Sequence, residues 1–413
     1  MKKSLLIVGI DLSLGGTEQA FLSAVRSLDS EQYDITLLLA RRSGSLLSQL
    51  PSCIQVRDMG AWGEWFTLSA ANARHVIPHC LLHRNPLYAA ELVPYLFAMA
   101  FGRRRREAFH RMWLHFMQKM PPLSGHYDAV LSFWGDRTMF YAAHKTDAAH
   151  HVTWMHFDYT AVAREDRLYE ACFSRCDRIA AVSRAGRDDL RRRFPALADR
   201  FVYIPNRINA ERIRTLAKAD CGLPRTGKAV RLLTVARLSP LKGIDLAIGA
   251  MAELCRRGVD AVWYFVGDGD SAYRRRLTAQ AEASGCADRI VFLGERENPY
   301  PLMADCDIYV QPSRSEAMPL TVEEAMILCR PTVVTRYPAA REQTDDGRYG
   351  VLCDADSRSI ADAVAALIAS EEGRSMLIHR LEERHAAPVT GSLPDLLSDI
   401  LGTSKDEKMP VKM

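Results

Sequence analysis

Two glutamates, Glu316 and Glu324, frame the segment of this 413-residue chain whose residue types are best suited to chemistry. The apolar run Ile308–Gln311 leads into them as a buried strand would, and Pro319 suits the first turn of a helix. We therefore expect Glu316 in a loop after a strand and Glu324 about a turn into the helix. Backbone amides at Met318–Thr321 would then face an anion, although a glutamate near a helix start is also a common cap.

Two cations follow an earlier apolar run in the same half of the chain. Arg237 and Lys242 flank a turn after Arg231–Val235, and a helix is expected from Gly243. Basic side chains that meet at the carboxyl end of a strand can clamp a diphosphate. The alternative is that both are ordinary solvated surface charges.

The first half of the chain offers a glycine pair and a histidine. Gly15 and Gly16 come after the run Leu5–Gly9 and open a helix, whose first amides favour anions. The pair does not match G-x-G-x-x-G, so a plain strand-to-helix turn is the alternative. His156 follows the run His151–Met155 and could hydrogen-bond a ligand, or it could be structural.

Strands and helices must position these residues, and short apolar runs alternate with amphipathic stretches along nearly the whole chain. This alternation predicts an α/β protein with two doubly wound, Rossmann-like domains facing across a cleft. We expect domains at 1–205 and 206–384, a helix at about 385–402 that packs back on the first domain, and a disordered tail at 403–413. The expected strands are Leu5–Gly9, Ile35–Ala40, Ala129–Ser132, His151–Met155, Arg178–Val182, Phe201–Ile204, Arg231–Val235, Ala261–Val266, Ile290–Leu293, Ile308–Gln311, Pro331–Val334 and Gly350–Cys353, with helices such as Gly243–Arg257, Tyr273–Ser284 and Pro319–Leu328.

Composition excludes several classes of protein. With 48% hydrophobic and 25% charged residues the chain is typical of a folded protein, and a net charge of +4 does not indicate a nucleic-acid binder. Ten scattered cysteines without a C-x-x-C pair fit a reducing compartment. The longest apolar tract, Leu87–Gly102, is interrupted by Glu91 and Pro94 and is shorter than the ~20 residues of a spanning helix, so no transmembrane segment is predicted.

Taken together, the motifs resemble those of family 4 glycosyltransferases of the GT-B fold, which are retaining enzymes that use nucleotide sugars. Gly15-Gly16-Thr17-Glu18 matches the family's glycine-rich first loop, Arg237 and Lys242 its Arg…Lys pair, and Glu316 and Glu324 its paired glutamates. Two further segments fall where the family has similar ones, Val266-Gly267-Asp268-Gly269 and Phe292-Leu293-Gly294.

The resemblance implies that Glu324 binds the nucleotide ribose and that Glu316 lies beside the donor sugar. Arg237 and Lys242 would neutralise the departing diphosphate, and His156 would hydrogen-bond the donor sugar or steady the oxocarbenium-like state. Fixed charges aimed at a leaving group stabilise the transition state, so no metal or cofactor is expected beyond the nucleotide sugar. The implied donor site also includes Gly15, Gly16, Met318, Pro319, Leu320 and Thr321.

Three groups of possible metal ligands are set aside. Asp305-Cys306-Asp307 and Asp268-Gly269-Asp270 each spell D-x-D, yet no third ligand for a hard cation is evident. Histidines recur every four residues along 75–83, but Pro78 is expected to interrupt a helix there. No metal site is therefore predicted.

A basic stretch at 103–119 carries six Arg or Lys residues against one acid, interleaved with aromatic residues, and it follows an apolar tract. Such a composition suits a helix on an anionic membrane, so a membrane surface is the partner expected at about 87–120. A solvated basic face and a groove for an acidic acceptor are the alternatives. No nucleic acid is expected, because no recognised module surrounds the stretch.

The resemblance thus implies a metal-independent, retaining hexosyltransferase. It would move a sugar from a UDP- or GDP-linked donor to a saccharide or lipid-linked acceptor in polysaccharide, lipopolysaccharide or glycolipid biosynthesis. We expect it in the cytoplasm, peripheral at the inner face of the cytoplasmic membrane. A nucleotide-sugar epimerase of the same fold and a non-catalytic sugar-nucleotide-binding protein are the alternatives. Ala317-Met318 stands where the family often has glycine followed by an aromatic or aliphatic residue. This difference leaves the identity of the donor sugar open.

Overall fold

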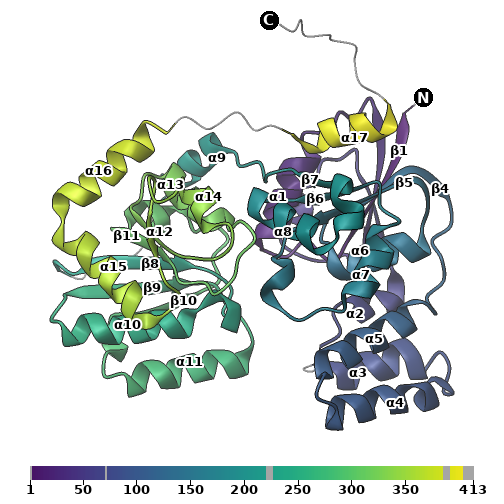
Figure 1. The fold of residues 1–413 in the computed structure, drawn as a ribbon, viewed down its shortest axis with the longest axis horizontal. Helices are drawn as coiled ribbons and strands as arrows, with labels where there is room; N and C mark the ends of the chain where they lie inside the picture. Colours follow the sequence, from purple (N-terminus) through teal and green to yellow (C-terminus); the bar gives the residue numbers. More distant parts are fainter. Residues whose placement is uncertain (1, 70–71, 220–226, 385–390, 403–413) are drawn as a thin grey trace, which may run out of the picture. The chain divides into compact units, whose positions relative to one another are not determined.

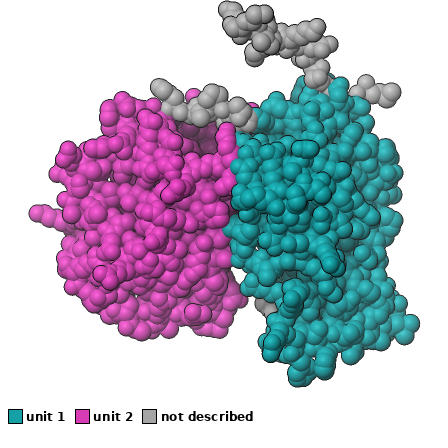
Figure 2. Space-filling view, viewed as in Figure 1, with its two compact units in different colours: residues 1–182, 187–206, 389–413 teal, residues 183–186, 207–388 magenta. Residues whose placement is uncertain are grey.

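The computed structural model describes residues 2–69, 72–219, 227–384 and 391–402, and these form two compact units (Figure 2). Unit 1 holds the described residues up to 182, 187–206 and those after 390, whereas unit 2 holds 183–186 and 207–384. Each unit contains one parallel sheet with flanking helices (Figure 1), which confirms the predicted α/β class with two Rossmann-like domains. The predicted tail and the part of the predicted helix at 385–390 lie outside the described residues.

The sheet of unit 1 has seven parallel strands in the order β3-β2-β1-β4-β5-β6-β7. The sequence predicted all of them except the edge strand β3. Val56 is the one residue of β3 that is even partly buried, so the strand carries no alternating apolar pattern. The strands are β1 Lys3–Gly9, β2 Tyr33–Leu39, β3 Gln55–Asp58, β4 His126–Ser132, β5 Asp147–Met155, β6 Arg178–Ala181 and β7 Phe201–Tyr203.

Helices of unit 1 cover this sheet and add a helical lobe, residues 60–117, between β3 and β4 (Figure 1). Inside the lobe the indole nitrogens of Trp65 and Trp113 each donate to the other residue's carbonyl, at 3.1 and 2.8 Å, which joins α2 to α5. The helices are α1 Gly16–Val25, α2 Gly63–Phe66, α3 Ala73–Ile77, α4 Tyr88–Phe101, α5 Arg105–Met117, α6 Asp136–Lys145, α7 Asp166–Phe173, α8 Arg184–Arg193, of which 187–193 belong to this unit, and α17 Leu393–Leu401.

The α-helix ends at Ile77, directly before Pro78, as expected, but the chain does not leave the helical region there. Backbone at Ile77 and Pro78 stays helical, and α3 continues directly into the π-helical turn η3 Pro78–Leu82. Proline fits this position because its fixed φ is helical, and the amide that it lacks ends the regular α-helical hydrogen-bond pattern of α3.

The sheet of unit 2 has six parallel strands in the order β10-β9-β8-β11-β12-β13. Successive residues of its central strands alternate between two apolar cores, so Leu232 and Trp263 pack on one face while Leu233 and Tyr264 pack on the other. The strands are β8 Val230–Val235, β9 Ala261–Val266, β10 Ile290–Gly294, β11 Ile308–Gln311, β12 Thr332–Thr335 and β13 Val351–Cys353.

Helices cover both faces of that sheet (Figure 1). Buried residues of α10 and α15 belong to one core, and buried residues of α12 and α13 belong to the other. The helices are α9 Ala210–Leu216, α10 Ile244–Arg256, α11 Ser271–Ala283, α12 Tyr300–Asp305, α13 Leu320–Ile327, α14 Ala340–Thr344, α15 Ser357–Ala369 and α16 Glu371–Glu382.

In each sheet the strand order changes direction once, so that the strands on one side follow the chain outward and those on the other side also follow it outward. This switch point lies between β8 and β11 in unit 2 and between β1 and β4 in unit 1. Connections on the two sides of such a point diverge, and ligands of open α/β sheets bind there, outside the carboxyl ends of the strands. The predicted diphosphate and sugar residues follow β8 and β11, and the glycine pair follows β1.

Candidate active site

The structure brings two predicted residues, Lys242 and Glu316, together at the switch point of unit 2. Lys242 ends the short 3-10 turn η6 Pro240–Lys242 after β8, and Glu316 lies in the loop after β11. The ammonium Nζ of Lys242 lies 2.7 Å from both carboxylate oxygens of Glu316. The Lys242 side chain is 30% exposed and that of Glu316 only 8%, so the carboxylate fixes a cation that ligands can reach.

Other donors fix the Glu316 carboxylate as well. The hydroxyl of Ser313 donates to Glu316 Oε1 at 2.7 Å, and the Gln311 amide donates to the same oxygen at 3.0 Å. Gln311 is itself oriented, because its Oε1 accepts from the hydroxyls of Tyr309 at 2.8 Å and Thr321 at 3.3 Å. A buried carboxylate with this many partners is held in one orientation.

Close backbone packing joins the two loops. Gly243 adopts a left-handed conformation at φ +65°, and a Cβ atom there would lie 1.9 Å from the carbonyl oxygen of Pro312. The amide of Arg314 donates to the Leu241 carbonyl at 2.8 Å, and its guanidinium binds Asp245 at 2.6 Å. Glycine at position 243 is therefore required for Lys242 to approach the loop that carries Glu316.

Arg237 lies in the same connection after β8, and its side chain is exposed. It makes no ion pair among the residues that the structure describes. The backbone at Ala236 rests against Gly267, where φ is +130° and a Cβ atom would lie 2.1 Å from the Ala236 carbonyl oxygen. The segment Val266-Gly267-Asp268-Gly269 thus supports the loop that presents Arg237.

Helix α13 begins one residue later than predicted. Pro319 is the N-cap, with extended backbone at φ −68° and ψ 122°, and Leu320 is the first helical residue. The proline ring provides no side-chain cap, so the amides of the first turn, including that of Thr321, are the positive end of the helix. Met318 packs on the apolar core beside this start, and the amide of Gln343 anchors the Pro319 carbonyl at 2.8 Å.

Glu324 lies on the buried side of α13, where the hydroxyl of Tyr300 donates to its Oε1 at 3.1 Å. Burial raises the pKa of the Glu324 carboxyl to about 7, and the hydrogen bond from Tyr300 offsets only part of that rise. The side chain can therefore change charge near neutral pH.

At the switch point of unit 1, a carboxylate already occupies the start of the helix that follows the glycine pair. Gly15 is the N-cap of α1 and Gly16 its first residue. A Cβ atom at Gly15 would lie 2.2 Å from Oε2 of Glu18, whose Oε1 accepts from the Trp134 indole at 2.9 Å. Glycine at position 15 is thus explained by its own helix, and donor binding by Gly15 and Gly16 stays a prediction.

His156 follows β5 in unit 1 and packs against two aromatic rings that also contact each other. Its ring centroid lies 4.4 Å from that of Phe133 and 5.4 Å from that of Trp154. Burial lowers the pKa of the His156 imidazole to about 3, so the ring is neutral at physiological pH. Its Nε2 is buried without a hydrogen-bond partner among the described residues, which leaves one polar atom for a ligand. A neutral ring can hydrogen-bond a sugar, but it supplies no positive charge.

Both D-x-D segments bind cations of the protein itself. Arg231 pairs with Asp305 at 2.5 Å and with Asp307 at 3.4 Å. Asp268 pairs with Arg274 at 3.2 Å, and Asp270 caps α11. These carboxylates therefore have structural roles.

Sequence reasoning missed the residues that orient the predicted ones. Gln311 and Ser313 stand at the end of a predicted strand, a place that could have suggested them. Tyr300, which contacts Glu324, and Gln343, which anchors Pro319, carry no sequence signal because they come from distant elements.

Comparisons with known proteins identify the domain that holds this site. Residues 229–370 match the family described as Glycosyl transferases group 1. The chain is 31% identical to a lipopolysaccharide core biosynthesis mannosyltransferase of Rhizobium leguminosarum bv. viciae over 198 residues, 44% of this chain and 56% of that protein. It is 25% identical to the N-acetyl-alpha-D-glucosaminyl L-malate synthase of Bacillus anthracis over 213 residues, 50% of this chain and 55% of that protein. The chain thus spans about half the length of these curated relatives.

Similarity to solved structures extends over both units. The fold is similar to that of HepE from Anabaena in complex with UDP and glucose, with a TM-score of 0.63 and 17% identity over 92% of this chain and 94% of that chain. The family match contains Arg237, Lys242, Glu316 and Glu324. The chain thus contains a group 1 glycosyl transferase domain at 229–370, which agrees with the family resemblance drawn from the sequence.

Proposed function

We propose that this chain transfers a sugar, with retention of anomeric configuration, from a UDP- or GDP-linked donor to a saccharide or lipid-linked acceptor in polysaccharide, lipopolysaccharide or glycolipid biosynthesis. The observation that carries the proposal is the Lys242–Glu316 pair, 2.7 Å apart at the switch point of a group 1 glycosyl transferase domain. Lipopolysaccharide core biosynthesis in one relative, and UDP with glucose in one structural neighbour, support this choice of donor and setting.

In the proposed reaction, the bond between the anomeric carbon and the diphosphate oxygen breaks, and the acceptor oxygen bonds to that carbon. The acceptor hydroxyl loses its proton, which the departing diphosphate can accept. Negative charge grows on the diphosphate, and fixed positive charge lowers the energy of that state. Lys242, the exposed Arg237 and the first amides of α13 supply this charge, so the proposal requires no metal ion.

The two glutamates have separate proposed roles. Glu316 lies beside the donor sugar, where Lys242 and Ser313 keep its carboxylate fixed for hydrogen bonds to sugar hydroxyls. Glu324 accepts hydrogen bonds from the nucleotide ribose. Ribose hydroxyls would replace the water that burial removed from the Glu324 carboxylate, and they would favour its ionised form. Roles for Gly15, Gly16 and His156 in donor binding stay predictions from the family resemblance.

A panel of UDP- and GDP-sugars, scored by thermal stabilisation and then by product formation with an acceptor extract, tests the proposal. A ligand at 100 times its Kd adds ~2.7 kcal/mol to stability, which is readily measured. We expect one donor to stabilise the wild type and the control Arg256→Ala, which removes an exposed cation of α10 paired with Glu253. Lys242→Ala should lose transfer.

Other outcomes of that panel contradict the proposal. Conversion of the donor sugar without any acceptor would indicate an epimerase. Binding of a nucleotide sugar with no turnover in any extract would indicate a non-catalytic binding protein. Equal turnover by the wild type and Lys242→Ala would remove the lysine from the site.

A membrane surface is the proposed second partner, and α4 supports it. Leu87, Val93, Phe97 and Phe101 are 76, 60, 65 and 77% exposed. Every exposed residue along 87–101 is apolar. None of the described helices is both long and apolar enough to cross a bilayer, so α4 is proposed to lie in the interface rather than to span it.

Charge beside α4 favours an anionic surface. The one acid of α4, Glu91, is paired with His115 of α5 and with Lys119, whereas the four arginines at 103–106 are all exposed. Each basic residue near an anionic bilayer contributes about 1 kcal/mol, or roughly fivefold in binding. We propose that the protein is cytoplasmic and binds the inner face of the cytoplasmic membrane through α4 and these arginines.

Vesicle flotation tests this surface. Phe97→Asp, and glutamine at all four arginines, should each strongly reduce binding to anionic vesicles. The control Met376→Asp, which alters an exposed apolar residue of α16 that is 47% exposed, should bind normally. Unchanged binding by the first two variants would contradict the proposal, and so would binding to a soluble acidic saccharide in place of vesicles.

A further inference from the structure

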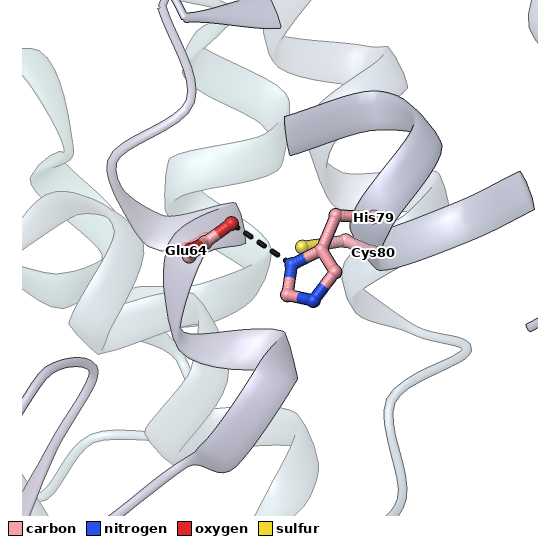
Figure 3. Close-up of side chains that lie close together, drawn as sticks. All are labelled: Glu64, His79 and Cys80. Atoms are coloured by element: carbon pink, nitrogen blue, oxygen red, sulfur yellow. Dashed lines mark hydrogen bonds and ion pairs between the residues drawn. The ribbon is translucent and has the colours of Figure 1, made fainter. Parts of the chain in front are cut away.

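Three side chains with different donor atoms meet in the helical lobe of unit 1, in a different unit from the Lys242–Glu316 pair (Figure 3). Glu64 comes from α2, whereas His79 and Cys80 are neighbours in the π-helical turn η3. One carboxylate oxygen, one imidazole nitrogen and one thiol sulfur all lie within 4.8 Å of one another. Neither the family match nor the proposed reaction uses these residues.

The side chains point toward one another. Nδ1 of His79 lies 3.0 Å from Oε2 of Glu64, and Nε2 of His75 lies 3.5 Å from the same oxygen. Cys80 is fully buried, is not in a disulfide, and has its Sγ 3.1 Å from the carbonyl oxygen of Ala61. The Glu64 side chain is 34% exposed and that of His79 is 43% exposed, so two of the three groups are open to solvent.

The π-helical turn accounts for this convergence. Adjacent residues of a regular α-helix do not share a face, and yet His79 and Cys80 both turn toward Glu64 (Figure 3). A π-helical turn is rare and often marks a functional position. Because the helix continues through Pro78, the reason for setting aside the histidines of this segment no longer holds.

The donor set selects the class of ion. Zinc binds oxygen and nitrogen at about 2.0–2.2 Å and sulfur at about 2.3 Å, which places tetrahedral ligands roughly 3.2–3.8 Å apart. The Glu64–His79 separation is 3.0 Å and no separation in the cluster exceeds 4.8 Å, so these atoms lie near the spacing that zinc requires. A thiolate with an imidazole favours zinc over magnesium or calcium, which prefer oxygen ligands.

We infer that Glu64, His79 and Cys80 form a zinc site that ties α2 to η3, with water at the fourth position and His75 beside the Glu64 carboxylate. The ion would replace the proton of the Cys80 thiol. It would hold the base of the α4–α5 hairpin, since η3 leads directly into α4. The role is structural, and it is independent of the proposed sugar transfer.

Metal titration of the full chain tests the site. Zinc affinity is measured by competition with a chromophoric chelator, and cobalt(II) is added as a spectroscopic probe, because a thiolate ligand gives an intense charge-transfer band. His79→Ala and Cys80→Ser should each weaken zinc binding by at least about 100-fold, more than the loss of a supporting residue costs. Glu64→Gln, of nearly the same shape, gives a third variant if Cys80→Ser does not fold.

Two matched controls distinguish the site from surface binding. His83→Ala removes the next histidine of the same segment, and His379→Ala removes a histidine of α16 that pairs with Glu383 at 3.3 Å. Both controls should keep wild-type affinity and the cobalt–thiolate band. Equal affinity in the wild type and Cys80→Ser, or a wild type without the band, would overturn the inference.

Discussion

The two units share a parallel sheet with one switch point, but they present different chemistry there. In unit 2 the connections after β8 and β11 carry Lys242 and Glu316, which form an ion pair at 2.7 Å. In unit 1 the connections after β1 and β4 carry Gly15 and Trp134, and Trp134 binds Glu18 of the helix that Gly15 caps. Topology therefore gives each unit a place for a ligand, and the side chains decide which unit can hold a diphosphate.

The two units also differ in the pKa of a buried titratable side chain. Burial raises the pKa of Glu324 to about 7 in unit 2 and lowers that of His156 to about 3 in unit 1. In both cases the low dielectric disfavours the charged form. At neutral pH, Glu324 is poised to change charge and His156 is not, so pH dependence should arise from unit 2.

The largest expected effect comes from the cation of unit 2. Lys242→Ala should lower kcat by ~10²–10³, because one charge-stabilising donor is removed from the leaving group. Steady-state kinetics with the identified donor measure the change, and the Arg256→Ala control should retain activity. A loss of less than twofold would break the assignment of diphosphate chemistry to this switch point.

Glu324→Gln should have the next largest effect. A hydrogen bond to a charged group contributes about 1.5–3 kcal/mol, so donor affinity should fall roughly 10–100-fold. Wild-type affinity should rise as pH increases through about 7, the pKa of the free carboxyl, since binding favours the ionised form. Calorimetric titration from pH 5.5 to 8.5 measures both, and a pH profile shared by the variant and the wild type would exclude Glu324.

A smaller effect is expected in unit 1. His156→Phe keeps the stacking with Phe133 and Trp154 and removes one neutral hydrogen bond, so kcat/KM should fall roughly 2–10-fold. The ratio of variant to wild-type kcat/KM should stay constant between pH 5 and 8, because the ring is already neutral. A ratio that changed with a midpoint near pH 6.5 would show that a charged imidazole acts.

The smallest effect concerns stability and has a definite sign. The Glu324 carboxyl has an ordinary pKa of 4.5 and a folded-state pKa of about 7, so its favourable contribution to folding is complete below pH 4.5 and is lost as pH rises through 7. Glu324→Gln should therefore gain Tm relative to the wild type between pH 5 and pH 8, by about 2–4 °C for each 1 kcal/mol relieved. Glu382→Gln, at an exposed position of α16, should show no such gain. A Tm difference between Glu324→Gln and the wild type that stays the same across this range would contradict the raised pKa.

Sequence reasoning succeeded where the pattern is local. The strands β9 Ala261–Val266 and β11 Ile308–Gln311 have the predicted bounds, because both are continuous apolar runs in a sheet covered on two faces. It failed where one neighbour decides the outcome. The backbone stays helical at Pro78, and Pro319 is the N-cap of α13 rather than its first residue. Residue spacing alone predicts neither.

Contacts between distant elements could not be predicted from the sequence. The hydrogen bond from Trp134 to Glu18, and the packing of Phe133 against His156, appear only once the chain is folded. Without them, the sequence leaves the glycines between an anion site and a plain strand-to-helix turn, and His156 between ligand binding and a structural role. The loops after β8 and β11 were predictable as a pair because each follows a strong strand.

The most direct test of the central claim compares nucleoside diphosphate with nucleoside binding. Calorimetry gives the Kd of UDP or GDP, and of the matching nucleoside, for the wild type, Lys242→Ala and Arg256→Ala. We predict that Lys242→Ala weakens the diphosphate at least about tenfold, that nucleoside affinity stays unchanged, and that Arg256→Ala alters neither. Equal diphosphate affinity in the wild type and Lys242→Ala, or an equal loss for both ligands, would contradict the account.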